Sequence, residues 1–180
     1  MTTAKELQEQ GVKLFQQKDY EAASRVFHQA KDAYEASQER DMVAEMQVNI
    51  GLVHRLLGEH QQALDEMQLA LETFRSSGDA LRTAMVLGNL GAVYLGLSDR
   101  EQAYNCYRQA ADIFQELGEK KLYGETMIAM ADLQVKEGKI SVGAATYEVG
   151  LEQLDDLSAS QKVIKGLLGF RNKLTGGGKS

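Results

Sequence analysis

Four residues of this sequence, three histidines and a cysteine, have side chains suited to metal binding or nucleophilic catalysis: His28, His54, His60 and Cys106. A zinc site needs several such ligands at short, characteristic spacings, and the histidines have no such spacing with one another or with acidic residues. Cys106 has no histidine or aspartate at a spacing that would make it a nucleophile. We therefore predict a buried helical thiol, and we predict no metal site, no cofactor and no catalytic centre.

Two further patterns concern carboxylate and phosphate chemistry. Asp155 and Asp156 are adjacent, which is typical of a solvated helix end, whereas general acid catalysis needs a carboxylate held in an apolar pocket. The run Gly-Gly-Gly-Lys-Ser at 176–180 lacks the preceding strand and the following helix that a phosphate loop requires. We expect His28 to be exposed and His54 to be packed in the core. The protein is accordingly predicted not to be an enzyme.

Charge is distributed unevenly along the 180 residues. The formal net charge is −6, yet residues 157–180 contain five basic residues and no acidic one, so the rest of the chain is strongly acidic. Phosphate binding needs a basic face, and no nucleic-acid partner is therefore expected. No apolar run reaches the length of about 18 residues that a membrane-spanning helix needs. The polar start MTTAKELQEQ does not fit a secretory signal, and a single cysteine fits a reducing compartment, so we expect a cytoplasmic protein.

The elements that carry these residues are set by a repeat of 40 residues. Small residues recur in register at Gly11, Gly51, Gly91 and Ala131, and again 12 positions later at Ala23, Ala63, Ala103 and Gly143. Large residues follow at Phe27, Met67, Tyr107 and Tyr147, and small ones at Ala30, Ala70, Ala110 and Gly150. A repeat of this length predicts a solenoid of stacked helix pairs. The small residues are expected to let the two helices of a pair approach closely.

The repeat predicts an all-α fold of four helix-turn-helix units, spanning about 3–37, 41–77, 80–117 and 121–156. A helix over 158–174, with an apolar stripe from Val163 to Leu174 and Ser160 as its cap, is expected to close the stack, because the end of a solenoid must cover its open apolar face. Residues 175–180 are predicted to be a flexible tail. At the other end, Thr3 and Glu6 have the spacing of a capping box.

The third unit contains the sequence Leu87, Leu90-Gly91, Tyr94, Ala103, Tyr107 and Ala110. This pattern resembles the tetratricopeptide repeat, and the period of 40 resembles the long-helix subclass found in bacterial signalling regulators and eukaryotic spindle-orientation adaptors. The resemblance covers about 150 residues. It implies a right-handed superhelical solenoid that acts as a protein-binding scaffold, in which the first helix of each pair lines a concave groove.

The same resemblance assigns groove positions in each unit. The apolar and small ones are Val12, Phe15, Val48, Leu52, Met85, Ala92, Leu95 and Ile128, and Asp132 is acidic. Asn49 and Asn89 occupy equivalent positions and offer both donors and an acceptor to a peptide backbone, although each amide also suits a bond within its own or a neighbouring helix. Arg55 suits a carboxylate of a ligand, or a salt bridge with Glu45 or Glu59. Tight curvature of the stack is an alternative reason for the apolar positions.

These features predict a binding protein whose partner is another protein or a peptide. An amphipathic helix or an apolar peptide suits the groove better than a charged tail. Two alternatives remain: self-association through the basic C-terminal helix, and assembly at a membrane surface through the same helix. The expected oligomeric state is a monomer or a weak homo-oligomer, and a membrane partner is the least favoured.

Overall fold

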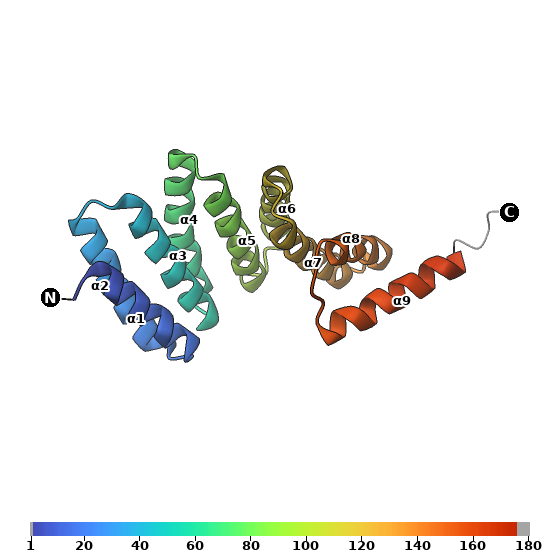
Figure 1. The fold of residues 1–180 in the computed structure, drawn as a ribbon, viewed down its shortest axis with the longest axis horizontal. Helices are drawn as coiled ribbons and strands as arrows, with labels where there is room; N and C mark the ends of the chain where they lie inside the picture. The colour runs from blue at the N-terminus through green and yellow to red at the C-terminus, as the bar shows by residue number, and fades with distance from the viewer. Residues whose placement is uncertain (1, 176–180) are drawn as a thin grey trace. The chain divides into compact units, whose positions relative to one another are not determined.

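The computed structural model describes residues 2–175, with side chains described up to residue 169, and the regular structure in this part of the chain is entirely α-helical (Figure 1). Nine helices follow one another within it: α1 (Ala4–Gln16), α2 (Tyr20–Ala36), α3 (Arg40–Leu56), α4 (His60–Ser77), α5 (Ala80–Gly96), α6 (Arg100–Leu117), α7 (Lys120–Lys136), α8 (Ile140–Glu152) and α9 (Ala159–Thr175). The predicted all-α fold is confirmed. The number of repeats and the handedness of the superhelix stay predictions, and most of the predicted tail lies outside the described residues.

Side chains at the helix ends satisfy backbone groups that the helices leave without partners. The Glu6 amide donates to the Thr3 hydroxyl over 3.2 Å, and the Thr3 amide donates to the Glu6 carboxylate over 2.7 Å, which completes the predicted capping box. Asp19 caps α2 by accepting from the Ala22 amide. The predicted cap of α9 was wrong. Ser158 accepts from the Gln161 amide, because α9 begins at Ala159, one residue before the predicted cap.

Every twentieth residue from Lys18 to Gly138 has a left-handed backbone conformation with positive φ. Glycine occupies this position at Gly58, Gly78, Gly118 and Gly138, with φ between 73° and 80°. Lys18, Gln38 and Ser98 adopt the same conformation with φ of 60° to 64°, although side chains with a Cβ disfavour it. Each 40-residue repeat therefore consists of two helix-and-turn segments of equal length, and three of the turns carry no glycine to mark them.

Close packing between small and large residues joins the helices of a pair. A Cβ added to Gly11 would lie 2.6 Å from two ring carbons of Phe27, and one added to Gly51 would lie 2.8 Å from Cγ of Met67. Phe27 and Met67 are both almost completely buried. The expected close approach at the small positions is confirmed for these two pairs, and it explains why small and large residues repeat in register.

The chain divides into two compact units, Met1–Cys106 and Tyr107–Ser180, which are described separately here. The core of the first unit contains Phe27, Tyr34, Met46, Ile50 and Val53, contributed by α2 and α3. In the second unit α7 packs on α8 at two glycines, since a Cβ on Gly150 would lie 2.8 Å from the carbonyl oxygen of Gly124. The side chains of Val163 and Leu167 on α9 are each 64% exposed. The capping role of this helix therefore stays a prediction.

An ion-pair cluster connects three helices of the first unit. Arg82, in the first turn of α5, donates from Nε to Asp79 over 2.6 Å and from Nη2 to Asp41 on α3 over 2.9 Å. Its guanidinium carbon also lies 4.5 Å from the ring centroid of Phe74 on α4, a cation–π contact. We call Asp41, Phe74, Asp79 and Arg82 the arginine cluster. It fixes the start of α5 against the two preceding helices.

Candidate functional site

The predicted binding residues fall on the odd-numbered helices, and most of them belong to the first unit. We define the odd-helix face by the predicted residues on α1, α3 and α5: Val12, Phe15, Val48, Asn49, Leu52, Arg55, Met85, Asn89, Ala92 and Leu95. The other two, Ile128 and Asp132, lie on α7 in the second unit. All ten residues of the odd-helix face are half-buried or exposed, whereas neighbouring positions such as Ile50 and Val53 are fully buried.

Several apolar side chains on this side of the first unit remain in contact with solvent. Val12 is 38% exposed and Met85 is 47% exposed, and Leu56 at the end of α3 is 42% exposed. The interpretation that curvature buries these positions between repeats does not hold for them. Exposed apolar side chains that gather on one side of a protein are typical of binding surfaces.

The two asparagines lie on helices that pack against each other, because α3 contacts α5. Both side chains are half-buried, and within the described part of the chain neither amide hydrogen-bonds another residue. The alternative in which each amide satisfies its own or a neighbouring helix is thus not realised. Their donors and acceptors stay available on the odd-helix face.

Arg55 also lies on this face without a carboxylate partner among the described residues. Its Nε is buried and makes no hydrogen bond there. The two expected partners are engaged elsewhere: Glu45 accepts from Nε2 of Gln8 over 2.7 Å, and Glu59 lies 2.6 Å from Nδ1 of His54. Neither alternative salt bridge of Arg55 forms.

A hydrogen-bond chain that the repeat pattern did not predict links α1, α2 and α3. The Tyr34 hydroxyl donates to Oε1 of Gln8 over 2.7 Å, and Gln8 in turn donates to Glu45. Burial raises the pKa of the Tyr34 hydroxyl, with the charge of Glu39 as the next cause. Gln8 and Glu45 therefore hold each other in place. The chain joins residues 26 and 37 positions apart, which no local pattern indicates.

His28, His54 and Cys106 are half-buried or buried among other side chains of the protein. His28 was predicted to be exposed, but it is half-buried, and burial followed by the charge of Lys31 lowers its pKa. His54 keeps 19% of its side chain exposed and binds Glu59, so it lies at the edge of the core. Cys106 is buried as predicted, and burial raises the pKa of its thiol to about 11. Among the described residues, no three His, Cys, Asp or Glu side chains converge to hold a metal ion.

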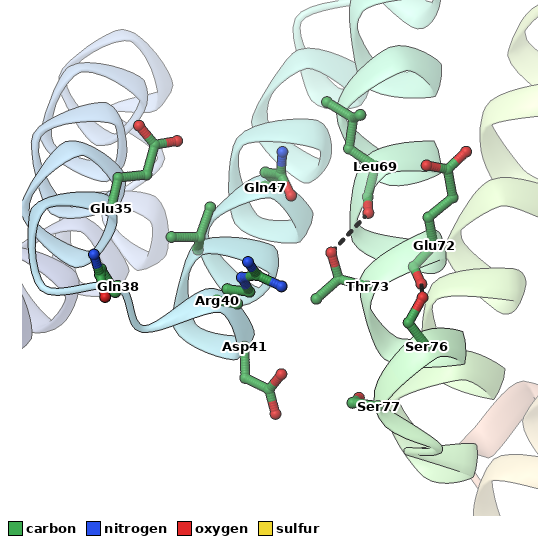
Figure 2. Close-up of a pocket in the computed structure, with 11 residues that line it drawn as sticks. Glu35, Gln38, Arg40, Asp41, Gln47, Leu69, Glu72, Thr73, Ser76 and Ser77 are labelled. Carbon is green, nitrogen blue, oxygen red and sulfur yellow. Dashed lines mark hydrogen bonds between the residues drawn. The ribbon is translucent and has the colours of Figure 1, made fainter.

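A cavity of about 870 Å³ opens in a different part of the first unit, between α2, α3 and α4 (Figure 2). Its lining residues are Glu35, Gln38, Arg40, Asp41, Val43, Gln47, Leu69, Glu72, Thr73, Ser76 and Ser77. None of them was predicted from the sequence. The repeat pattern is defined by positions that pack within a helix pair, whereas this cavity lies between one pair and the next.

The described residues form no helix with both the length and the apolar character needed to cross a lipid bilayer.

Comparison with known proteins finds similarity in one family and in solved structures. The model of the family described as tetratricopeptide repeat matches residues 42–116. The crystal structure of BtubC (BKLC) from P. vanneervenii is similar with a TM-score of 0.76 and 16% identity, covering 96% of this chain and 72% of BtubC. The apo form of RapI is similar with a TM-score of 0.79 and 17% identity, covering 97% of this chain and 51% of RapI, so this chain spans about half of RapI. No curated protein sequence matches, and the likeness to the two structures is one of fold alone.

Proposed function

Since residues 42–116 are tetratricopeptide repeats, as the sequence predicted, we propose that this protein is a non-catalytic scaffold that binds a segment of another protein on its odd-helix face. Repeats of this kind stack helix pairs into an extended surface, and function depends on the side chains presented there. The reducing cytoplasm is the proposed compartment, because the chain has a single cysteine.

The observation that carries this proposal is the pair of unpartnered amides at equivalent positions of adjacent repeats. Asn49 and Asn89 are separated by one repeat length, and apolar side chains such as Leu52 and Met85 lie on the same helices. An amide binds a peptide backbone through its donors and its acceptor, whatever the peptide's side chains are. Apolar neighbours add area that favours an amphipathic helix or an apolar extended segment. We therefore propose a ligand with apolar side chains and an accessible backbone.

Binding by the asparagines is tested with the double variant Asn49→Ala/Asn89→Ala. The matched control is Gln62→Ala/Gln102→Ala, which removes two exposed amides that are also one repeat apart but lie on even-numbered helices. Partners are first isolated from the native source with the unmodified protein. The dissociation constant of each partner is then measured by calorimetry for all three proteins.

The asparagine variant is expected to bind at least about tenfold more weakly, because each lost hydrogen bond contributes about 1 kcal/mol. The glutamine control should keep the original affinity, and the helical circular dichroism of both variants should be unchanged. An unaltered dissociation constant in the asparagine variant would show that these amides do not hold the partner.

Self-association is a second candidate function, favoured by the exposed side chains of α9. Val163 and Leu167 are solvent-exposed, and Lys162 and Lys165 nearby are exposed as well. A helix with apolar and basic residues suits the acidic body of a second copy, or an anionic bilayer. Sedimentation at increasing concentration, with and without residues 158–180, tests the first option, and vesicle flotation tests the second. A mass that stays monomeric at all concentrations would exclude self-association.

A further inference from the structure

The cavity in the first unit is a cleft with two walls and a floor. Glu35 lies on the wall formed by α2, and Glu72 and Leu69 lie on the wall formed by α4. Val43 and Gln47 on α3 lie between the walls, and Figure 2 shows Gln47 between Glu35 and Glu72. Its volume of about 870 Å³ lies within the range of about 300–1,000 Å³ that is usual for ligand sites. We call the lining residues of this cavity together the α2–α4 cleft.

Gln47 is the observation that distinguishes this cleft from an ordinary surface depression. Its side chain lines the cavity although the residue is only 8% exposed. Among the residues that the structure describes, none hydrogen-bonds its amide. Its amide atoms are not among the fully enclosed side-chain atoms that lack a hydrogen bond, so they open onto the cavity. Polar groups in such a place are satisfied by water or by a bound molecule. An amide that lines a cavity can be satisfied by a bound ligand.

The carboxylates of the cleft differ in whether they are already engaged. Asp41 is held by Arg82 in the arginine cluster. Glu35 and Glu72 are exposed, and neither forms an ion pair within the described part of the chain. Arg40 is the one basic side chain that lines the cleft, so the two free carboxylates outnumber it. The cleft therefore favours a cationic ligand.

The hydroxyl groups add acceptors to the cleft. Thr73 donates to the carbonyl of Leu69 over 3.2 Å, and Ser76 donates to the carbonyl of Glu72 over 2.7 Å (Figure 2). Each hydroxyl has thus used its only proton on its own helix and keeps lone pairs for a ligand. Acceptors exceed donors, and a complementary ligand must be rich in donors.

The geometry points to a guanidinium binding site: the α2–α4 cleft takes an arginine side chain of a peptide segment from a partner protein. Guanidinium has five N–H donors in a plane and binds carboxylates through two parallel hydrogen bonds. Glu35 and Glu72 accept from it, and Oε1 of Gln47 accepts a further N–H. The apolar side chains of Leu69, which is 50% exposed, and Val43 cover the methylene stem.

A cleft of this volume also holds peptide backbone beside the arginine. Arg40 then has a role, because it can donate to a backbone carbonyl of the same segment. The site uses none of the residues of the odd-helix face, and so it goes beyond the function proposed above. It gives the scaffold a second, chemically different binding surface in the same unit.

The test uses the tripeptide acetyl-Ala-Arg-Ala-amide as the probe, titrated into the isotopically labelled full chain and followed by NMR. The matched peptide contains citrulline, which has the same shape as arginine but no charge. The arginine peptide is expected to shift the side-chain amide signals of Gln47, and the citrulline peptide should bind at least about tenfold more weakly, because hydrogen bonds to charged groups are the stronger ones. Free arginine and spermidine are titrated in parallel.

Two protein variants distinguish a specific effect of the two cleft carboxylates from an effect of the protein's net negative charge. Glu35→Gln/Glu72→Gln should weaken binding of the arginine peptide at least about tenfold. The control Glu21→Gln/Glu116→Gln removes the same charge at exposed positions outside the cleft and should bind as the unmodified protein does. Circular dichroism checks that all variants keep their helices.

Three results would overturn the proposal. Equal losses of affinity in both double variants would show that only the net charge of the protein matters. Equal affinity for the citrulline and arginine peptides would show that the cleft does not recognise the guanidinium group. Free arginine or spermidine that binds as tightly as the peptide, with the same Gln47 shifts, would make the cleft a small-molecule site. Peptide-induced shifts confined to the odd-helix face would refute the cleft while leaving the proposed scaffold function in place.

Discussion

Replacement of glycine by alanine is expected to have opposite effects at two helical positions, Gly11 and Gly88. Both lie inside helices, where alanine is favoured over glycine by about 1 kcal/mol because it restricts the unfolded backbone. A Cβ at Gly88 would meet no atom within 4 Å, so Gly88→Ala should keep this gain. A Cβ at Gly11 would lie 2.6 Å from two ring carbons of Phe27, well inside the usual contact distance of about 3.5–4.0 Å.

The size of the effect at Gly11 follows from the surroundings of Phe27. The ring is 1% exposed and belongs to the core of the first unit, so it cannot move without disturbing Ile50 and its neighbours. Overpacking of this kind costs about 1–3 kcal/mol, and at two short contacts with a rigid ring we expect the upper half of that range. After the gain in helix propensity, Gly11→Ala should destabilise the protein by about 1–2 kcal/mol. The two variants should then differ by about 2–3 kcal/mol.

Urea unfolding followed by circular dichroism measures this difference. For a slope of about 2 kcal/mol per molar urea, the two midpoints should lie about 1–1.5 M apart. Terminal repeats can open before the rest of an array, and hydrogen exchange of the amides in α1 and α2 therefore supplies the local stability.

A double-mutant cycle with Phe27→Leu tests the cause. In the Phe27→Leu background the smaller side chain leaves room for the Cβ, and Gly11→Ala should lose its destabilising effect and approach the gain of about 1 kcal/mol expected at Gly88. The reasoning is refuted if Gly11→Ala stabilises the unmodified protein as Gly88→Ala does, or if the two substitutions are additive.

Two further predictions concern charge and thiol chemistry. Arg82→Ala should destabilise the first unit by about 1–2 kcal/mol, which the urea midpoint measures. The expected loss is modest because the arginine cluster is partly exposed to solvent. Hydrogen bonds from the amide and then the side chain of Arg82 lower the pKa of Asp79 below its ordinary 3.8, so this stabilisation is present above pH 3.8 and is lost as the pH falls through the lowered pKa. Arg82→Ala removes the side-chain contribution and keeps the backbone amide that caps α5, so it should flatten the acid limb of stability against pH only in part, and an unchanged limb would contradict the account. The buried Cys106, with a pKa of about 11, should react with an aromatic disulfide at pH 8 only as fast as the protein opens, and complete reaction of the native protein within seconds would argue against its burial.

Much of the helical organisation could be predicted from the sequence, because it depends on local and periodic signals. Thr3 and Glu6 form a capping box from residues three apart, and Gly78 ends α4 in the left-handed conformation that glycine favours. The close packing of Gly11 on Phe27 follows from a pattern that repeats every 40 residues.

Other features could not be predicted, because local signals were absent or ambiguous. Lys18, Gln38 and Ser98 take the left-handed conformation that their residue types disfavour, so residue type alone does not indicate it. Ser158 and Ser160 are equally good caps by type, and only the actual start of α9 selects Ser158. The burial of His28 likewise depends on neighbours from other helices.

By itself, the sequence determined which residues form helices, where small residues let those helices touch, and which family the repeats resemble, since all of these depend on neighbours along the chain or on a fixed period. Only the tertiary structure decided which polar groups find partners. Arg82 reaches Asp41 across 41 positions, Glu45 and Glu59 bind Gln8 and His54 rather than Arg55, and Gln47 is left facing a cleft between two helix pairs. The physical reason is that hydrogen bonds and ion pairs are short-ranged and directional, so they are set by how one helix pair packs on the next.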